Sequence, residues 1–120
     1  MEIKEIKWLC EDAKEAILKV SDNTFAVDVF CHPCLYKEGD LVEDLLYSSG
    51  ERDILRVDQE TFLSILKNNL KEGYQIIAEV INAPERLVGV GAIKIQLSSP
   101  LPKDIKNHDK IIFYPSRLSL

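Results

Sequence analysis

Short segments in which apolar and polar residues alternate recur along most of this 120-residue chain, and clusters of turn-forming residues separate them. An alternation with a period of two places every second side chain on the same face of a β-strand. Residues 25–30 and 74–81 show this pattern, and turn clusters at 21–24 and 82–85 stand beside them. Residues 87–97 are also rich in β-forming residues. The sequence therefore predicts a mainly β structure with short connections.

The first twenty residues fit two different patterns. Across residues 3–20, apolar side chains recur every three or four positions, as on one face of a helix. The same stretch also alternates in two shorter segments, at 6–10 and 15–20, around a turn at 11–14. We favour two strands, because a strand at 25–30 needs a neighbour and the segment 15–20 is the nearest one.

The segment 58–72 is predicted to be the one α-helix of the chain. Asp58 is a favourable N-cap, and Gly73 suits the position just after a helix. The apolar residues of this segment keep helical spacing. They are Phe62, Ile65, Leu66 and Leu70.

The order of the elements is several strands, one helix and several more strands, with shorter strands expected at 41–47, 53–57 and 111–114. This order is that of an oligonucleotide-binding-like (OB-like) barrel, in which one helix follows the third strand. We therefore predict a single domain over 1–120 with a mainly β (α+β) fold. It would be a small OB-like β-barrel of about six to eight strands, with one α-helix near 58–72.

Two parts of the chain, 31–42 and 106–120, resemble uncharacterised small bacterial β-barrel proteins. Both segments have a polar turn that enters an apolar run. The resemblance implies a barrel fold. It implies no activity and no functional residue.

The long segment 87–97 has a feature of its own. Gly89 and Gly91 fall on one face of it, and glycines inside a strand mark a bulge or a sharp bend. A long β-rich segment left at a sheet edge can pair with a second copy of the chain. A homodimer is therefore one expectation.

The charge and the cysteine content narrow the functional classes. The chain has 15 Lys and Arg residues and 20 Asp and Glu residues, so its net charge is 15 − 20 = −5. An acidic balance disfavours a protein that binds the phosphate backbone of nucleic acids. The apolar stretches are far shorter than the ~18 residues of a membrane span, and no secretion signal is recognisable. Three cysteines, an odd count, fit free thiols in a reducing cytoplasm, which is the expected location.

The sequence Cys-His-Pro-Cys at 31–34 is the motif nearest to known chemistry. Following an apolar strand, it resembles the Cys-x-x-Cys site of the thioredoxin family, which implies a thiol redox role. A helix should follow such a pair, but Gly39 falls there. A zinc site on Cys31 and Cys34 needs two more ligands, and the chain has no second Cys-x-x-Cys pair. We favour a third interpretation, in which these cysteines are small buried residues at the end of a strand.

Aromatic residues close to cations are the remaining candidates. Trp8 beside Lys7, and Tyr114 near Arg117, could stack on the bases of a single-stranded nucleic acid. Aromatic residues on strands are more often part of the core, which is the interpretation we favour. His108 lies in a polar loop and is expected to be solvated. No set of catalytic residues is recognisable, and no metal or other cofactor is expected.

These patterns predict a non-catalytic binding module, with a protein as the expected partner. Two alternatives stay open. One is an OB-like domain that binds single-stranded nucleic acid, and the other is a thiol redox or zinc protein that uses Cys31 and Cys34.

Overall fold

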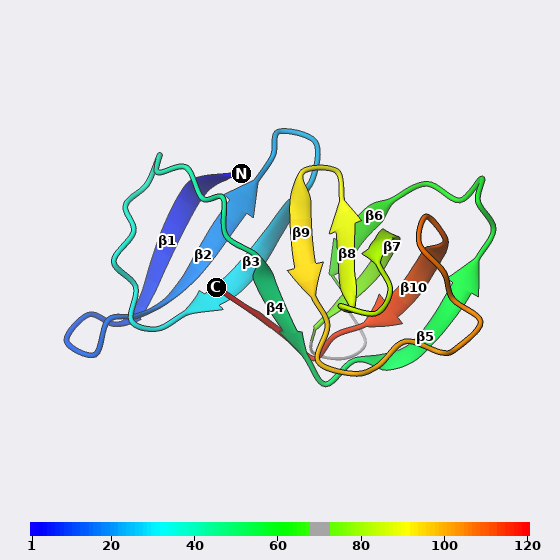
Figure 1. The fold of residues 1–120 in the computed structure, drawn as a ribbon. Coiled ribbons are helices and arrows are strands. Elements are labelled where there is room, and N and C mark those ends of the chain that lie inside the picture. Colours follow the sequence, from blue (N-terminus) through cyan, green and yellow to red (C-terminus); the bar gives the residue numbers. More distant parts are fainter. Residues whose placement is uncertain (68–72) are drawn as a thin grey trace.

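The computed structural model describes residues 1–67 and 73–120, and all its strands belong to one sheet (Figure 1). Within these ranges the chain forms strands, turns and loops but no helix. The described residues accordingly include no helix long and apolar enough to span a membrane. The strands are β1 (Glu2–Cys10), β2 (Glu15–Ser21), β3 (Ala26–Cys31), β4 (Leu46–Ser49), β5 (Arg52–Val57), β6 (Ser64–Lys67), β7 (Tyr74–Asn82), β8 (Leu87–Val90), β9 (Ile93–Gln96), β10 (Lys110–Tyr114) and β11 (Arg117–Ser119).

The strands follow a single path across the sheet, in the order β1-β2-β3-β11-β4-β9-β8-β7-β10-β5, and β6 pairs separately with β7. Most neighbours are antiparallel, but β3 with β11 and β4 with β9 are parallel. The last strand of the chain thus lies in the middle of the sheet, between β3 and β4. Because β1 and β5 end the path without pairing to each other, the sheet is open, and the predicted closed OB-like barrel is wrong.

The mainly β class is confirmed, but the expected six to eight strands are too few, because eleven strands are described. The two-strand interpretation of residues 3–20 is confirmed by β1 and β2, which pair antiparallel across the turn at 11–14. The strand predicted at 41–47 is displaced, because β4 begins only at Leu46. Leu41 instead forms an isolated bridge to Glu2.

The segment 87–97 is a hairpin, β8–β9, rather than one long strand. Gly91 has a φ of 61° and is the first residue of a two-residue loop, a position that favours glycine because it needs a positive φ. Both strands of the hairpin are paired on each side, with β7 and β4 as the outer neighbours. The segment therefore offers no edge for the expected homodimer.

The α-helix predicted near 58–72 is wrong over its described part. Asp58 does accept a hydrogen bond from a following backbone N–H, that of Glu60 at 2.9 Å, but within a turn. The Thr61 N–H then closes that turn on the Asp58 carbonyl at 2.9 Å. The same side chain that caps a helix also stabilises such turns, so the N-cap signal was ambiguous. Residues 68–72 lie outside the described residues.

Pairing with β7 explains why this segment is extended. Ser64–Lys67 pairs antiparallel with the first residues of β7, and Ile65 packs against the core. Phe62, which a helix would have buried, is 88% exposed. Long-range strand pairing therefore outweighs a local helical spacing, which is a weak preference.

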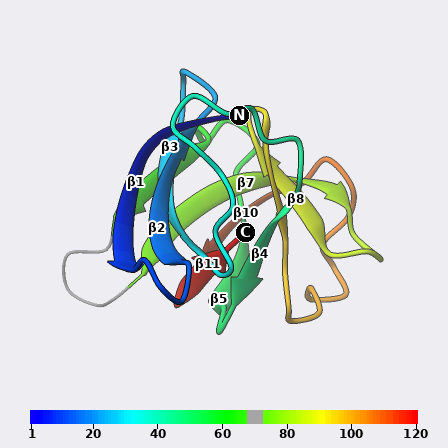
Figure 2. The ribbon, with the colours of Figure 1, turned by 90° about the vertical axis from the view of Figure 1, so that its left-hand side faces the viewer.

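The core fills the inside of the curled sheet, and Figure 2 shows β1 and β2 on one side of it and β8 on the other. Alternate residues of β2, β3, β7 and β9 face this core. The long connection between β3 and β4 adds Cys34 and Val42. The largest fully buried side chains are Phe113, Ile3, Leu18, Leu46, Ile76, Ile93, Ile95, Leu97, Ile111, Val20, Val29 and Val80.

Candidate binding groove between β3 and β7

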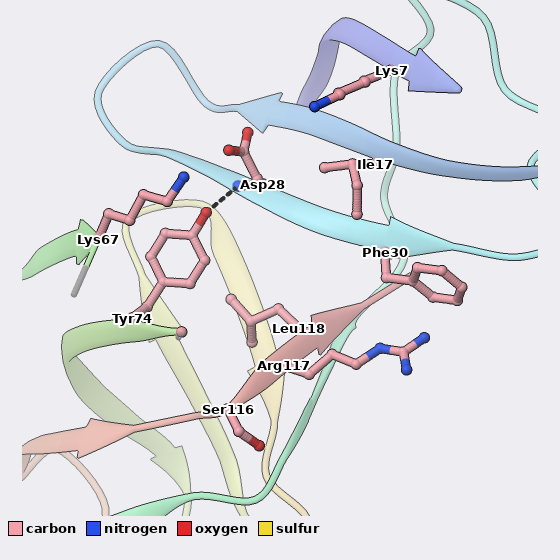
Figure 3. Close-up of a pocket in the computed structure, with 10 residues that line it drawn as sticks. Lys7, Ile17, Asp28, Phe30, Lys67, Tyr74, Ser116, Arg117 and Leu118 are labelled. Atoms are coloured by element: carbon pink, nitrogen blue, oxygen red, sulfur yellow. Dashed lines mark hydrogen bonds between the residues drawn. The ribbon is translucent and has the colours of Figure 1, made fainter. Parts of the chain in front are cut away.

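The edge of β3 that faces β11 is only partly covered. β11 pairs with β3 at a single position, Ser119 with Phe30, and the Leu120 N–H donates to the Phe30 carbonyl at 2.9 Å. Farther along this edge, the Asp28 N–H donates to the hydroxyl oxygen of Tyr74 at 3.0 Å. A side chain from the start of β7 thus lies where a neighbouring strand would otherwise be (Figure 3).

A groove of about 540 Å³ opens at this place. Its apolar surface comes from Ile17, Phe30 and the buried Leu118. Figure 3 shows Lys7 on one side, Lys67 and Tyr74 at one end, and Arg117 with Phe30 at the other. The remaining lining residues are Asp28, Gly73 and Ser116.

The groove is cationic, although the chain as a whole is acidic. In the part of its lining that the structure describes, three positive side chains, Lys7, Lys67 and Arg117, stand against one carboxylate, Asp28, which gives 3 − 1 = +2 in a chain of net charge −5. Among the described residues, none of these three cations forms an ion pair. The groove therefore offers positive charge to a ligand that carries negative charge.

The aromatic side chains in the groove are both engaged. The Arg117 guanidinium carbon lies 3.8 Å from the centre of the Phe30 ring, a cation–π contact. The Tyr74 hydroxyl accepts the hydrogen bond from Asp28. Burial, with the adjacent Asp28 carboxylate as a smaller cause, raises the pKa of Tyr74. The phenol therefore stays protonated and uncharged at neutral pH.

Strand alternation explains how the sequence places these residues. In β2 and β3 one set of alternate residues is buried in the core, so the other set points to the opposite face. The register aligns Lys7, Ile17 and Phe30 in one row across β1, β2 and β3. Asp28 lies on the same face, two residues before Phe30. A local pattern thus builds one wall of the groove.

A smaller hollow of about 210 Å³ continues the groove along β3 towards β6. It shares Asp28, Lys67 and Tyr74 with the larger hollow and adds Lys19, Ala26, Val27 and Ile65. β6 pairs with β7, and no other described strand pairs with it. The edge of β3 and the strand β6 therefore line the same hollow.

The cysteines lie elsewhere. Cys31 and Cys34 are each 2% exposed, and neither is in a disulfide. Burial, together with the neighbouring Cys34, raises the pKa of the Cys31 thiol to about 12. Because the thiolate is the nucleophile, this environment suits a structural cysteine better than a redox one.

The part of the chain that the structure describes contains no group of side chains that could serve as the ligands of a zinc ion. The register brings Cys10, beside Glu15, to the same end of β1–β3 as Cys31, beside Ala16. Even so, no three His, Cys, Asp or Glu side chains of the described residues are grouped for a metal ion. Structural zinc usually needs four such ligands.

The structure separates the aromatic–cation pairs suggested by the sequence. Arg117 contacts Phe30 rather than Tyr114. Trp8 is 38% exposed near the free edge of β1 and does not line the groove, although Lys7 does. His108 is exposed, as expected.

No motif in the sequence points to Phe30, Tyr74 or Lys67 as site residues. The alternation over residues 25–30 already placed Asp28 and Phe30 on the face opposite the core, which was the available signal. In comparisons with known proteins, no family model matches the chain, and no curated protein or solved structure is significantly similar to it. The groove must therefore be interpreted from its own geometry.

Proposed function

We propose that the protein is a non-catalytic binding module whose groove holds an acidic, extended segment of a protein partner. The observation that carries this proposal is the set of three cations, Lys7, Lys67 and Arg117, with no ion-pair partner among the described residues. Charge complementarity of this kind selects a partner and speeds its association. The two hollows share lining residues and follow one another along β3, an arrangement that suits an extended chain.

The aromatic residues favour a peptide over a single-stranded nucleic acid. Binding of single strands relies on aromatic faces on which successive bases stack. Arg117 already lies over the Phe30 ring, and Tyr74 is held by its hydroxyl to β3. Among its described lining residues the groove thus has three cations but two aromatic rings, one of which already carries Arg117 on one face. Nucleic acid remains the second candidate, on the strength of the cations.

The titratable groups also support binding rather than catalysis. General acid–base catalysis needs a group whose pKa lies near the working pH. The pKa of Tyr74 is raised from a value that is already high, and Asp28 is the single carboxylate among the described residues that line the groove. These groups can orient a ligand by charge and hydrogen bonding.

A defined peptide tests the proposal. The probe is the capped heptapeptide Thr-Glu-Val-Thr-Val-Glu-Thr, titrated into the isotope-labelled protein and followed by NMR. We expect shifts of groove residues at about 0.01 M salt, and weaker binding at about 1 M, where the screening length falls from about 30 Å to about 3 Å.

Charge reversal provides the matched comparison. The double variant Lys7→Glu, Lys67→Glu should bind the peptide about tenfold more weakly. The control is Lys94→Glu, Lys103→Glu, which makes the same charge change at exposed sites outside the groove. An equal loss of affinity in the two double variants would refute specific binding in the groove. Tighter binding of an oligothymidylate than of the peptide would favour the nucleic-acid alternative.

A further inference from the structure

The backbone of β3 is open towards the groove. Along a strand, the N–H and C=O of one residue point to one edge and those of the next residue to the other. The Phe30 carbonyl bonds to Leu120 and the Asp28 N–H bonds to Tyr74, so both residues point to the same edge. Ala26, two residues earlier, points there as well. Within the described residues, the Asp28 carbonyl has no hydrogen-bond donor on this edge.

Tyr74 holds β7 away from this edge. Its side chain extends from the start of β7 to the backbone of β3, as Figure 3 shows. Two paired strands lie only about 4.8 Å apart, which leaves no room for a tyrosine between their backbones. The hydroxyl oxygen thus replaces the carbonyl oxygen that a neighbouring strand would present to the Asp28 N–H.

From these observations we infer that the ligand binds by adding one β-strand along the Ala26–Asp28 edge of β3. A carbonyl of the added strand replaces the Tyr74 hydroxyl as the acceptor of the Asp28 N–H. This inference rests on the proposed function, because it describes how the acidic segment is held. Main-chain hydrogen bonds then give affinity, and the side chains of the added strand give specificity, as in other cases of strand addition.

The side chains around the edge define the preferred sequence of such a strand. On the outer face, Asp28 lies between Lys67 at one end of the groove and Arg117 at the other (Figure 3). A strand with two carboxylates flanking a hydroxyl residue would match these charges and keep its carboxylates away from Asp28. On the inner face, apolar side chains would meet Leu118. The probe peptide above follows this pattern, since successive side chains of a strand alternate between faces.

Backbone methylation separates strand addition from binding through side chains alone. Two isomers of the heptapeptide carry N-methyl groups at alternate residues, one isomer on each edge of the strand. We expect at least one isomer to bind about tenfold more weakly than the unmethylated peptide, because it lacks the N–H groups that face β3. Equal binding of all three peptides would overturn strand addition and leave the proposed function intact.

The variant Tyr74→Phe supplies an independent readout. Removing the hydroxyl removes the group that competes for the Asp28 N–H, so the peptide should bind about two- to tenfold more tightly. In this variant the Asp28 amide lacks its Tyr74 acceptor, so hydrogen exchange should show it protected only when the peptide is bound. Weaker binding by Tyr74→Phe would mean that the hydroxyl contacts the ligand. That result would overturn the inference that the added strand displaces the hydroxyl.

A neutral peptide with Gln in place of both Glu residues distinguishes a failure of strand addition from a failure of the proposed function. If the neutral peptide protects the Asp28 amide as well as the acidic one does, the edge accepts a strand and the charge-based function is refuted. If neither peptide protects it although the acidic peptide binds, strand addition is refuted and the proposed function stands; if neither peptide binds, both proposals are refuted.

Discussion

Strands β1–β3 and strands β4–β11 are assembled in different ways. In the first region each strand pairs with the strand that precedes it in the chain. In the second region, β11 separates β3 from β4, and β4 pairs with β9 rather than with β5. Both parallel pairings of the sheet involve these long-range neighbours. The first region is built from local hairpins alone. The second contains consecutive pairs as well, from β6 to β9, but its assembly also depends on contacts between distant parts of the chain.

The groove lies where the two regions meet. The local region supplies a regular edge on β3, with Asp28 and Phe30 facing outwards. Strands β4–β11 cover only one end of that edge, through Ser119. Farther along, they contact it through the Tyr74 hydroxyl. The groove that we propose as a binding site is thus formed where two assemblies of strands are joined incompletely.

The largest expected effect tests the strand that joins the two regions. Leu118→Ala removes a side chain of β11 that is 3% exposed, and it should lower the free energy of unfolding by about 2–5 kcal/mol. Urea denaturation measures this loss. Leu18→Ala is the matched change in β2, where the same side chain is fully buried.

Hydrogen exchange distinguishes these two leucine variants. Leu118→Ala should reduce amide protection in both β3 and β4, because β11 is the neighbour they share. Leu18→Ala should affect β1–β3 first. If Leu118→Ala loosened β11 alone, the two regions would be joined mainly by something other than this strand.

A second prediction separates local from long-range hydrogen bonds at one carboxylate. Asp22 Oδ1 accepts the backbone N–H groups of Thr24 and Phe25, at 2.9 and 2.7 Å, and Oδ2 accepts that of Ala92 at 2.9 Å. Asp22→Asn keeps one oxygen for the local turn but loses the bond to the β8–β9 loop. We expect a loss of about 1 kcal/mol for Asp22→Asn and about 2 kcal/mol for Asp22→Ala, measured by urea denaturation.

The pH dependence of the Asp22→Asn effect follows from the same bonds. Partial burial acts to raise the pKa of Asp22, but the N–H groups of Phe25, Ala92 and Thr24 outweigh it and lower the pKa. The contribution of the carboxylate is therefore complete above its unfolded pKa of about 3.9 and is lost as the pH falls through the lower folded value. The wild-type protein and Asp22→Asn should therefore approach the same free energy of unfolding in acid. A difference that persisted there would assign the effect to something other than the charge.

The smallest effect compares one exposed thiol with two buried ones. Cys10 is exposed at the edge of the sheet, whereas Cys31 and Cys34 are buried. A thiol reagent should modify one cysteine quickly and two slowly at neutral pH, and denaturant should make all three fast. Fast reaction of Cys31 in the native protein would contradict its raised pKa and its burial.

The same contrast explains what the sequence could predict. Residues 15–20 and 25–30 were predicted as strands because their alternation and the turn between them are local signals. β11 has three residues and β6 has four, too few for a period of two to be recognised. β6 also lies in a segment whose apolar residues fit a helix.

The groove itself was not predictable from local patterns. Its outward side chains on β3 follow from alternation, but their grouping with Tyr74 depends on a contact between residues 46 positions apart. Arg117 was noted as a cation near an aromatic residue, yet its ring partner, Phe30, is far away in the chain. A single sequence gives the residue types of such a site, but it does not show which distant residues come into contact.

The central position of β11 has a consequence for synthesis on the ribosome. Domains begin to form from their N-terminal part while the chain is still being made. The β1–β3 hairpins can form early, but β3 and β4 lack their common neighbour until residues 117–119 have been added. The nascent chain therefore carries an unprotected edge on β3 until residues 117–119 follow, and that edge is the one that we propose the mature protein offers to its ligand.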